Sequence, residues 1–241
     1  MRIVTIANQK GGTAKSTTAA ALAQAATHRG KHCLAIDLDP QGNLSFFLAA
    51  DTARAGAFEM LEGQPAEVQH AAGGLEVIAA SWNLQTISSS RGSARRLRAA
   101  LEPIAAQYEL IVIDTPPTAG ELQYNALMAS TDLIIPLQAD IVGLQGLYQM
   151  ADTARQIQQS NPGLTLTGFI LTRHGGRSTL ARQMAETIKE RAAEMGIPFL
   201  MAIREAVAIR EAQTLQSDLY EYAPNSKPAQ DYMQLLEMLA V

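Results

Sequence analysis

The stretch Asn8-Gln9-Lys10-Gly11-Gly12-Thr13-Ala14-Lys15-Ser16-Thr17-Thr18 (NQKGGTAKSTT) decides how this sequence is interpreted. It follows an apolar run, Ile3–Ala7, and leads into a helical pattern that begins at Ser16. A glycine-containing loop between a strand and a helix presents backbone N–H groups and a helix N-terminus, and together these bind anions. The stretch therefore has the position of a phosphate-binding loop.

The loop departs from the usual phosphate-binding pattern, G-x-x-x-x-G-K-[ST], at both glycines. Gln9 stands at the first glycine position and Ala14 at the second, and an additional lysine, Lys10, lies at the front of the loop. In a phosphate loop Lys15 would reach the β- and γ-phosphates and the Ser16 hydroxyl would ligate Mg²⁺. A plain strand–turn–helix corner with exposed lysines would have the same local sequence, so the loop alone leaves both interpretations open.

Apolar runs of strand length alternate with helical patterns along the chain. The predicted strands are Ile3–Ala7, Cys33–Asp37, Leu75–Ala79, Leu110–Asp114, Leu133–Leu137, Leu166–Thr172 and Phe199–Ile203. The predicted helices are Ser16–Arg29, Ala94–Tyr108, Glu121–Ser130, Leu144–Ser160, Thr179–Met195 and Ala229–Leu239. Continuous apolar strands are typical of a sheet covered by helices on both faces. The sequence therefore predicts an α/β fold with a doubly wound, mainly parallel sheet.

Composition narrows the class of protein further. No linker-like stretch or repeat divides the 241 residues, so we expect one domain over residues 1–241. No apolar run approaches the roughly 18 residues of a membrane-spanning helix, and Met1–Ile6 is typical of a strand rather than of a signal peptide, which favours a cytoplasmic protein. The single cysteine, Cys33, is expected in the core and excludes an internal disulfide. With a net charge of −4, any contact with nucleic acid must come from a local basic patch.

Carboxylates end two of the predicted strands. Asp37 and Asp39 lie in LAIDLDPQGN, and Asp114 lies in LIVIDTPP. Ligands of an open parallel sheet bind beyond the carboxyl ends of its strands, so the loop and both segments converge on one edge. An aspartate at this place suits a Mg²⁺ ion that accompanies a nucleotide. Taken singly, each aspartate could equally be a turn or a helix cap.

The segments KGGTAKST, IDLDPQGN and VIDTPP together resemble the ParA/MinD group of deviant Walker-A ATPases, and most of all its Soj-like DNA-partition proteins. The resemblance continues through ALMASTDLIIPLQADIVGLQGL and ILTRHGGRS to SKPAQDYMQLLEML, and so covers nearly the whole chain. It implies a P-loop NTPase fold, ATP and Mg²⁺ as cofactors, and a slow, partner-stimulated hydrolysis of ATP to ADP and phosphate.

The resemblance also implies roles for individual residues. Those that would bind the nucleotide are Lys10, Gly11, Gly12, Thr13, Ala14, Lys15, Ser16, Thr17 and Arg173, and those that would hold the metal are Ser16, Asp39 and Asp114. The catalytic residues would be Lys10, Lys15 and Asp39. Lys10 would reach the phosphates bound by a partner subunit, as an arginine finger does, and Asp39 would orient the attacking water. Asp37 is expected to support the loop lysine or the metal.

Ala14 replaces the commoner glycine of the family. Glycine would permit a positive φ, whereas alanine strongly prefers a negative φ. We therefore expect the site to survive if this position is right-handed helical.

The expected output is DNA partition. An ATP-bound homodimer would bind nonspecific DNA at the nucleoid, and a ParB-like centromere-binding partner would stimulate hydrolysis and so release it. The acidic C-terminal amphipathic helix argues against membrane binding. The candidate DNA contacts are Arg173, Arg177, Arg182, Lys189, Arg204 and Arg210. Glutamates interleave with them, so a solvated mixed-charge surface is the alternative.

Two other functions remain open at this point. A positioning ATPase of the same fold would place a protein cargo, such as a secretion, chemosensory or conjugation complex, without a DNA-partition role. A small-molecule ATP-dependent ligase is the more distant possibility, and the sequence contains no second nucleophile or metal constellation for a co-substrate.

Overall fold

The computed structural model describes residues 1–87, 93–174 and 179–241 and contains one eight-stranded sheet. Its strands are β1 (Arg2–Ile6), β2 (Cys33–Asp37), β3 (Gln69–His70), β4 (Glu76–Ile78), β5 (Leu110–Asp114), β6 (Asp132–Leu137), β7 (Thr165–His174) and β8 (Phe199–Arg204). Their order is β3-β4-β2-β5-β1-β6-β7-β8, and every pair is parallel except β3 with β4. This confirms the predicted fold class.

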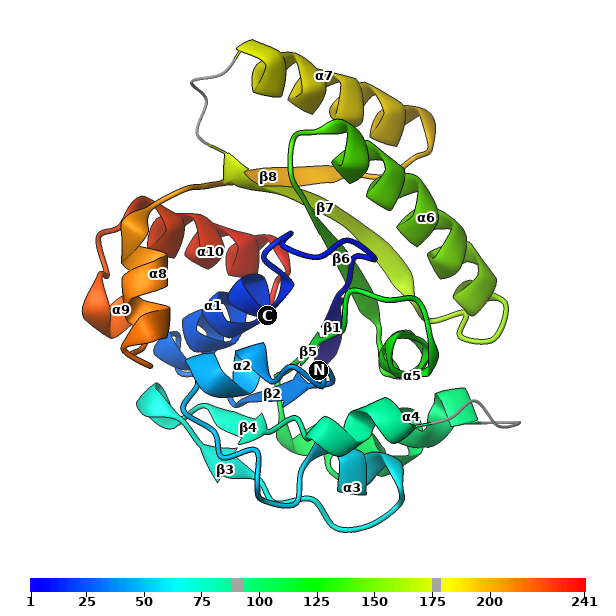
Figure 1. Ribbon diagram of the computed structural model, residues 1–241, viewed down its shortest axis with the longest axis vertical. Helices are drawn as coiled ribbons and strands as arrows, with labels where there is room; N and C mark the ends of the chain where they lie inside the picture. Colours follow the sequence, from blue (N-terminus) through cyan, green and yellow to red (C-terminus); the bar gives the residue numbers. More distant parts are fainter. Residues whose placement is uncertain (88–92, 175–178) are drawn as a thin grey trace.

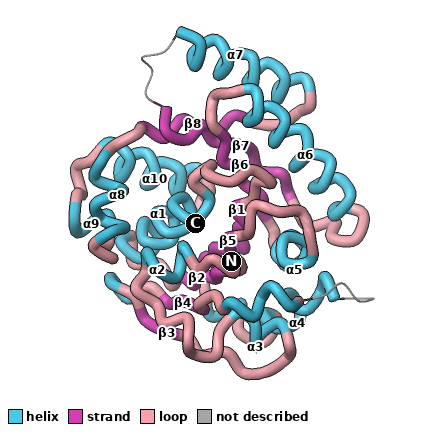
Figure 2. The backbone as a smooth tube through the Cα atoms, viewed as in Figure 1, coloured by secondary structure: helices cyan, strands magenta, loops and turns pink. Residues whose placement is uncertain are grey.

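Helices cover both faces of the sheet (Figure 1). They are α1 (Lys15–His28), α2 (Asn43–Phe47), α3 (Ala57–Leu61), α4 (Arg96–Leu101), α5 (Glu121–Ala129), α6 (Ile141–Gln158), α7 (Thr179–Glu194), α8 (Val207–Thr214), α9 (Leu219–Tyr222) and α10 (Lys227–Met238). Figure 2 shows α1, α8, α9 and α10 grouped on one side of the sheet and α5 and α6 on the other. No helix in the described part of the chain is long and apolar enough to cross a membrane.

The strands supply side chains alternately to the two faces. Val4 and Val112 pack in the cluster that contains α1 and α10, whereas Ile3, Ile111 and Ile113 pack in the cluster that contains α3 and α4. This alternation is the period of two that a strand imposes. It explains why strands covered on both faces are apolar throughout, and why β2 and β5 coincide with their predicted bounds.

One predicted helix is wrong. Instead of a single helix over Ala94–Tyr108, the chain forms a 3₁₀ turn at Ser93–Arg95, the short helix α4 and a second 3₁₀ turn at Ala105–Gln107. The cause is Pro103, because proline lacks the N–H donor and its ring clashes with the carbonyl four residues earlier, that of Ala99. By contrast, the C-terminal helix packs on the core as expected, with Leu235 and Leu236 buried.

Candidate functional site

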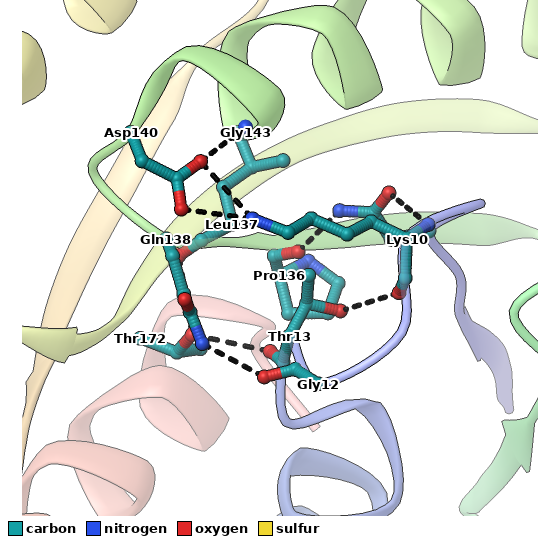
Figure 3. A network of polar contacts seen from close by, with 10 residues as sticks. Lys10, Gly12, Thr13, Pro136, Leu137, Gln138, Asp140, Gly143 and Thr172 are labelled. Carbon is teal, nitrogen blue, oxygen red and sulfur yellow. Dashed lines mark hydrogen bonds and ion pairs between the residues drawn. The ribbon is translucent and has the colours of Figure 1, made fainter.

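The phosphate loop, residues 7–14, joins β1 to α1 and is held by side chains from distant elements (Figure 3). Asn8 accepts a hydrogen bond from the Lys10 N–H (3.0 Å) and donates one to the carbonyl of Pro136 (2.8 Å). Gln138 donates to the carbonyl of Gly12 (2.8 Å), and the Thr172 hydroxyl lies 3.1 Å from the carbonyl of Thr13. These contacts turn loop carbonyls towards β6 and β7, which fixes the loop before any ligand binds.

The two loop lysines have different surroundings. Lys15 is buried, and its Nζ donates to the carbonyl of Lys10 (3.2 Å). Burial lowers the pKa of Lys15, while the charges of Asp114 and Asp39 act to raise it. A buried ammonium with one carbonyl partner is well placed to receive a phosphate oxygen.

Lys10 is engaged elsewhere in its own chain. Its Nζ lies 2.8 and 3.1 Å from the two carboxylate oxygens of Asp140, which also accepts a hydrogen bond from the Gly143 N–H (2.6 Å) and caps α6 (Figure 3). Partial burial would raise the pKa of Asp140, but the hydrogen bonds from Lys10 and Gly143 outweigh it and the pKa is lowered. The additional lysine of the loop therefore lies in an ion pair at the N-terminus of α6.

The strand-end carboxylates meet at the carboxyl edge of the sheet, as predicted. Asp37 and Asp114 are register partners on β2 and β5. Asp114 accepts a hydrogen bond from the Thr115 N–H (3.0 Å), but its Oδ2 is buried with no hydrogen-bond partner in the described structure. Burial, and then the charge of Asp37, raise the pKa of Asp114 well above its usual value, while the Ser16 hydroxyl and Lys15 oppose this.

This donor set fits a magnesium ion. The free Oδ2 of Asp114, the Ser16 hydroxyl and the nearby Asp39 are oxygen ligands, which Mg²⁺ prefers. No group of three or more His, Cys, Asp or Glu residues that could hold a metal occurs within residues 1–87, 93–174 and 179–241. Mg²⁺ needs no such group beside a nucleotide, because it keeps several waters and takes phosphate oxygens as ligands.

Of the two parts expected for Asp37, its contacts fit support of the metal residue Asp39 and not of the loop lysine. Its Oδ2 accepts hydrogen bonds from the N–H and hydroxyl of Ser45 (both 2.8 Å), and its Oδ1 accepts one from the Asp39 N–H (3.0 Å). Burial raises the pKa of Asp37 to about 6, against the hydrogen bonds from Ser45. Its hydrogen bonds run to the segment that carries Asp39 and not to Lys15, so it shapes the path of that segment.

Ala14 does not meet the condition expected of it. It has φ 66° and ψ 34°, the left-handed region, and precedes α1 without capping it through a side chain. For a residue with a Cβ this conformation costs about 1–2 kcal/mol. The hydrogen bonds of Gly12 and Thr13 hold the loop so that Ala14 accepts this conformation.

A small cavity of about 50 Å³ lies beside the loop and continues towards β8. It is lined by Ala14, Thr17, Thr172, Arg173, Ile203, Arg204, Glu205, Ala206, Ile209, Arg210, Gln213 and Tyr232. The predicted nucleotide residues Ala14, Thr17 and Arg173 thus share one cavity. Sequence reasoning missed Gln213, whose amide donates to the Thr17 hydroxyl (3.0 Å), and Tyr232, whose hydroxyl lies 3.1 Å from that of Thr18.

The candidate DNA contacts are scattered, and several have acidic partners. Lys189 pairs with Glu186 (2.8 Å) and lies over the ring of Phe199, and Arg210 pairs loosely with Glu205 (3.5 Å). Arg204 is bound by Asp231 (2.6 Å). The remaining described candidate on α7, Arg182, is exposed and contacts Thr179; Arg177 lies outside the described residues.

These features define a P-loop nucleotide-binding protein with a deviant Walker-A loop. They are the doubly wound sheet, the phosphate loop with its second lysine, and the two aspartates that end β2 and β5. The comparisons with known proteins agree with this class. A family model described as "AAA domain" matches residues 1–166. The chain is 33% identical over 241 residues to the chromosome-partitioning ATPase Soj of Thermus thermophilus, covering 98% of this chain and 94% of that protein.

Solved structures share the whole fold. A cobyrinic acid a,c-diamide synthase from Mycobacterium smegmatis with bound ADP and magnesium matches with a TM-score of 0.85 and 29% identity, covering 100% of this chain and 94% of that one. The septum site-determining protein MinD of Pyrococcus horikoshii, complexed with Mg-ADP, matches with a TM-score of 0.81 and 26% identity over 99% and 95% of the two chains. The chain therefore belongs to the ParA/MinD family of P-loop ATPases.

Proposed function

We propose that this protein is an ATP-dependent DNA-partition ATPase whose 241 residues work as one domain. Two copies bind ATP and Mg²⁺ between them, the dimer binds nonspecific DNA, and a ParB-like partner stimulates hydrolysis and so releases the dimer. The observation that carries the proposal is the location of Lys10. Its side chain extends to Asp140 at the N-terminus of α6, whereas the Lys15 side chain turns back to the loop of its own subunit, so Lys10 would leave the pair with Asp140 to act on a second subunit.

Each site residue has a task in this proposal. Lys15 and the loop N–H groups would bind the phosphates, and Ser16, Asp39 and, through water, Asp114 would hold the metal. Mg²⁺, when bound, neutralises charge on the β- and γ-phosphate oxygens. Asp39 orients the attacking water, and its backbone is fixed by the hydrogen bond from its N–H to Asp37. Lys10 from the partner subunit stabilises the charge of the transferring phosphoryl group.

Exposed apolar side chains support a dimer across the carboxyl edge of the sheet. They stand in the segments that follow β2, β4, β6, β7 and β8, and they are Phe46, Trp82, Ile141, Val142, Leu180 and Val207. Trp82, the single tryptophan, is 66% exposed. Exposed apolar side chains in segments that follow the carboxyl ends of the strands suit a surface that becomes buried against another protein. A second copy of this chain is the partner that Lys10 requires.

DNA binding is proposed for the exposed side chains of Arg173, Arg182 and Arg210 and for the half-buried Lys189. Such contacts go to phosphates and carry no sequence information, so binding would be nonspecific and would weaken steeply with salt. A single copy offers few of them and has net charge −4. Two copies double the number of contacts, which is why we expect DNA binding to require the ATP-bound dimer.

The test is DNA binding by Asp39→Ala at several salt concentrations, with ATP or ADP. This variant should bind ATP and dimerise without hydrolysis, so it should hold DNA with ATP and release it with ADP. Lys15→Ala is the matched control and should not bind DNA with either nucleotide. Absence of DNA binding at low salt would overturn the partition function, and rapid hydrolysis by monomeric Asp39→Ala would overturn the role of Asp39.

One observation favours a second function, the positioning of a protein cargo. Lys189, Arg204 and Arg210 already have acidic partners in their own chain, which weakens the case for a DNA surface. A positioning ATPase would dimerise with ATP but bind no DNA in the same experiment. ATP consumption that depends on added cobyrinic acid would instead favour the reaction for which the M. smegmatis neighbour is named.

A further inference from the structure

Two consecutive residues of α10 bind two different elements beside the phosphate loop. Asp231 binds Arg204 at the end of β8, and Tyr232 binds Thr18 in the first turns of α1. Arg204 and Tyr232 both line the cavity. The C-terminal helix therefore connects the helix that carries Lys15 and Ser16 with the end of β8, which lines the cavity.

The contact between Arg204 and Asp231 is unusually complete. The Arg204 backbone N–H donates to Asp231 (2.8 Å), as do Nε (3.0 Å to each carboxylate oxygen) and Nη2 (2.6 Å). Nη2 also donates to the carbonyl of Lys227 (3.2 Å). The Asp231 side chain is 7% exposed, so the pair fixes both the side chain and the backbone of Arg204. Forked contacts of this kind constrain geometry more than a point charge does.

The other side of the cavity is held less tightly. Among the described residues from Glu205 to Gln213, one side-chain hydrogen bond, Gln213 to Thr17, reaches α1, and Ile209 and Ala212 add apolar packing against the same core cluster. The cavity measures about 50 Å³, whereas pockets that hold small molecules measure about 300–1,000 Å³. A nucleoside would therefore enter by moving the α8 side outward, while Arg204 stays anchored.

We propose that Arg204, Asp231 and Tyr232 are positioning residues for the nucleoside end of the nucleotide, so that α10 determines how well the site distinguishes ATP from a bare triphosphate. This inference rests on the proposed ATP site. It also gives Arg204 a part inside the chain in place of the expected contact with DNA. The phosphates remain the task of the loop; α10 packs against α1, which follows the loop, and Tyr232 hydrogen-bonds to Thr18 there.

The experiment compares two ligands, ATP and inorganic tripolyphosphate, each with Mg²⁺, by calorimetry. Arg204→Met should weaken ATP binding about tenfold and change tripolyphosphate binding less than about twofold, because only the nucleoside wall is released. Arg204→Lys keeps the charge but loses the fork, so it should be intermediate. Arg29→Met is the control, since it removes an exposed arginine that pairs with Glu237, another residue of α10.

A second variant separates positioning from folding. Arg204→Met leaves the Asp231 carboxylate buried without its partner, which lowers the melting temperature. Arg204→Met/Asp231→Leu removes both charges and should recover most of that stability, while the ratio of ATP to tripolyphosphate affinity stays low. Equal weakening of both ligands, no weakening, or recovery of the ratio in the double variant would overturn the inference. A wild-type protein that binds neither ligand would instead overturn the proposed ATP site.

Discussion

The two ends of the candidate nucleotide site are built differently. At the phosphate end, Thr13 and Asp114 are fully buried, Lys15 is nearly so, and neighbouring backbone and side chains fix them. At the outer end, Arg173 and Arg210 line the cavity and are exposed. Buried polar groups need partners with defined geometry, whereas exposed charges keep their water and tolerate many arrangements. The phosphate end is therefore specified by a short motif, and the outer end is specified by contacts that only the fold creates.

The largest expected effect tests the phosphate end. Lys15→Ala removes the buried ammonium that lies among Asp114 and Asp39, so ATP binding and hydrolysis should both be lost. The measurements are ATP affinity by calorimetry and phosphate release. Lys31→Ala removes an exposed lysine that pairs with Glu109 and should leave both unchanged. ATP binding by Lys15→Ala at near wild-type affinity would show that the loop is an ordinary strand–turn–helix corner.

Substitution of Lys10 should affect the hydrolysis of ATP but not its binding to one subunit. If it acts in trans as an arginine finger does, Lys10→Ala should slow turnover by about 10³-fold while one subunit still binds ATP. Asp140→Asn keeps an oxygen that accepts from the Gly143 N–H but loses the ion pair. Because that pair is partly exposed and such pairs are worth less than about 1 kcal/mol, its loss should raise ATP-dependent dimerisation up to about fivefold. Sedimentation measures the dimer, and weaker dimerisation of Asp140→Asn would contradict a restraining role.

The same contrast explains how much of the molecule the sequence predicts. The bounds of β2 and β5 and the meeting of Asp37 with Asp114 follow from continuous apolar runs that end in an aspartate. Within the helix predicted over 94–108, Pro103 indicates the break that the structure shows. The pair of Lys10 with Asp140 joins residues 130 positions apart, and no local pattern indicates it. No local pattern indicates the pair of Arg204 with Asp231 either, because the function of this pair depends on where β8 and α10 pack.

The buried carboxylates predict a dependence of stability on pH. The pKa of Asp37 is about 6 in the folded protein and 3.8 ordinarily, so between these values the folded state binds more protons than the unfolded state. The free energy of unfolding should therefore fall as pH rises from about 4 to 6, by up to about 3 kcal/mol, and Asp114 acts in the same direction. Denaturant unfolding without nucleotide or Mg²⁺ measures this. Asp37→Asn should make the free energy of unfolding depend less on pH, whereas Asp51→Asn, at an exposed position, should not. An unchanged pH dependence in Asp37→Asn would assign the titration to other groups.

The smallest expected effect concerns Ala14, where the phosphate end departs from its own motif. Glycine adopts φ 66° without a Cβ penalty, so Ala14→Gly should stabilise the protein by roughly 1 kcal/mol, less the greater entropy of glycine in the unfolded chain. Ala20→Gly, in the right-handed interior of α1, should instead destabilise by about 1 kcal/mol. Denaturant midpoints separate the two signs. If Ala14→Gly is more stable yet hydrolyses ATP at the wild-type rate, the left-handed conformation is imposed by Gly12, Thr13 and their partners. If turnover changes with stability, the strain at Ala14 is part of how the loop meets the phosphates.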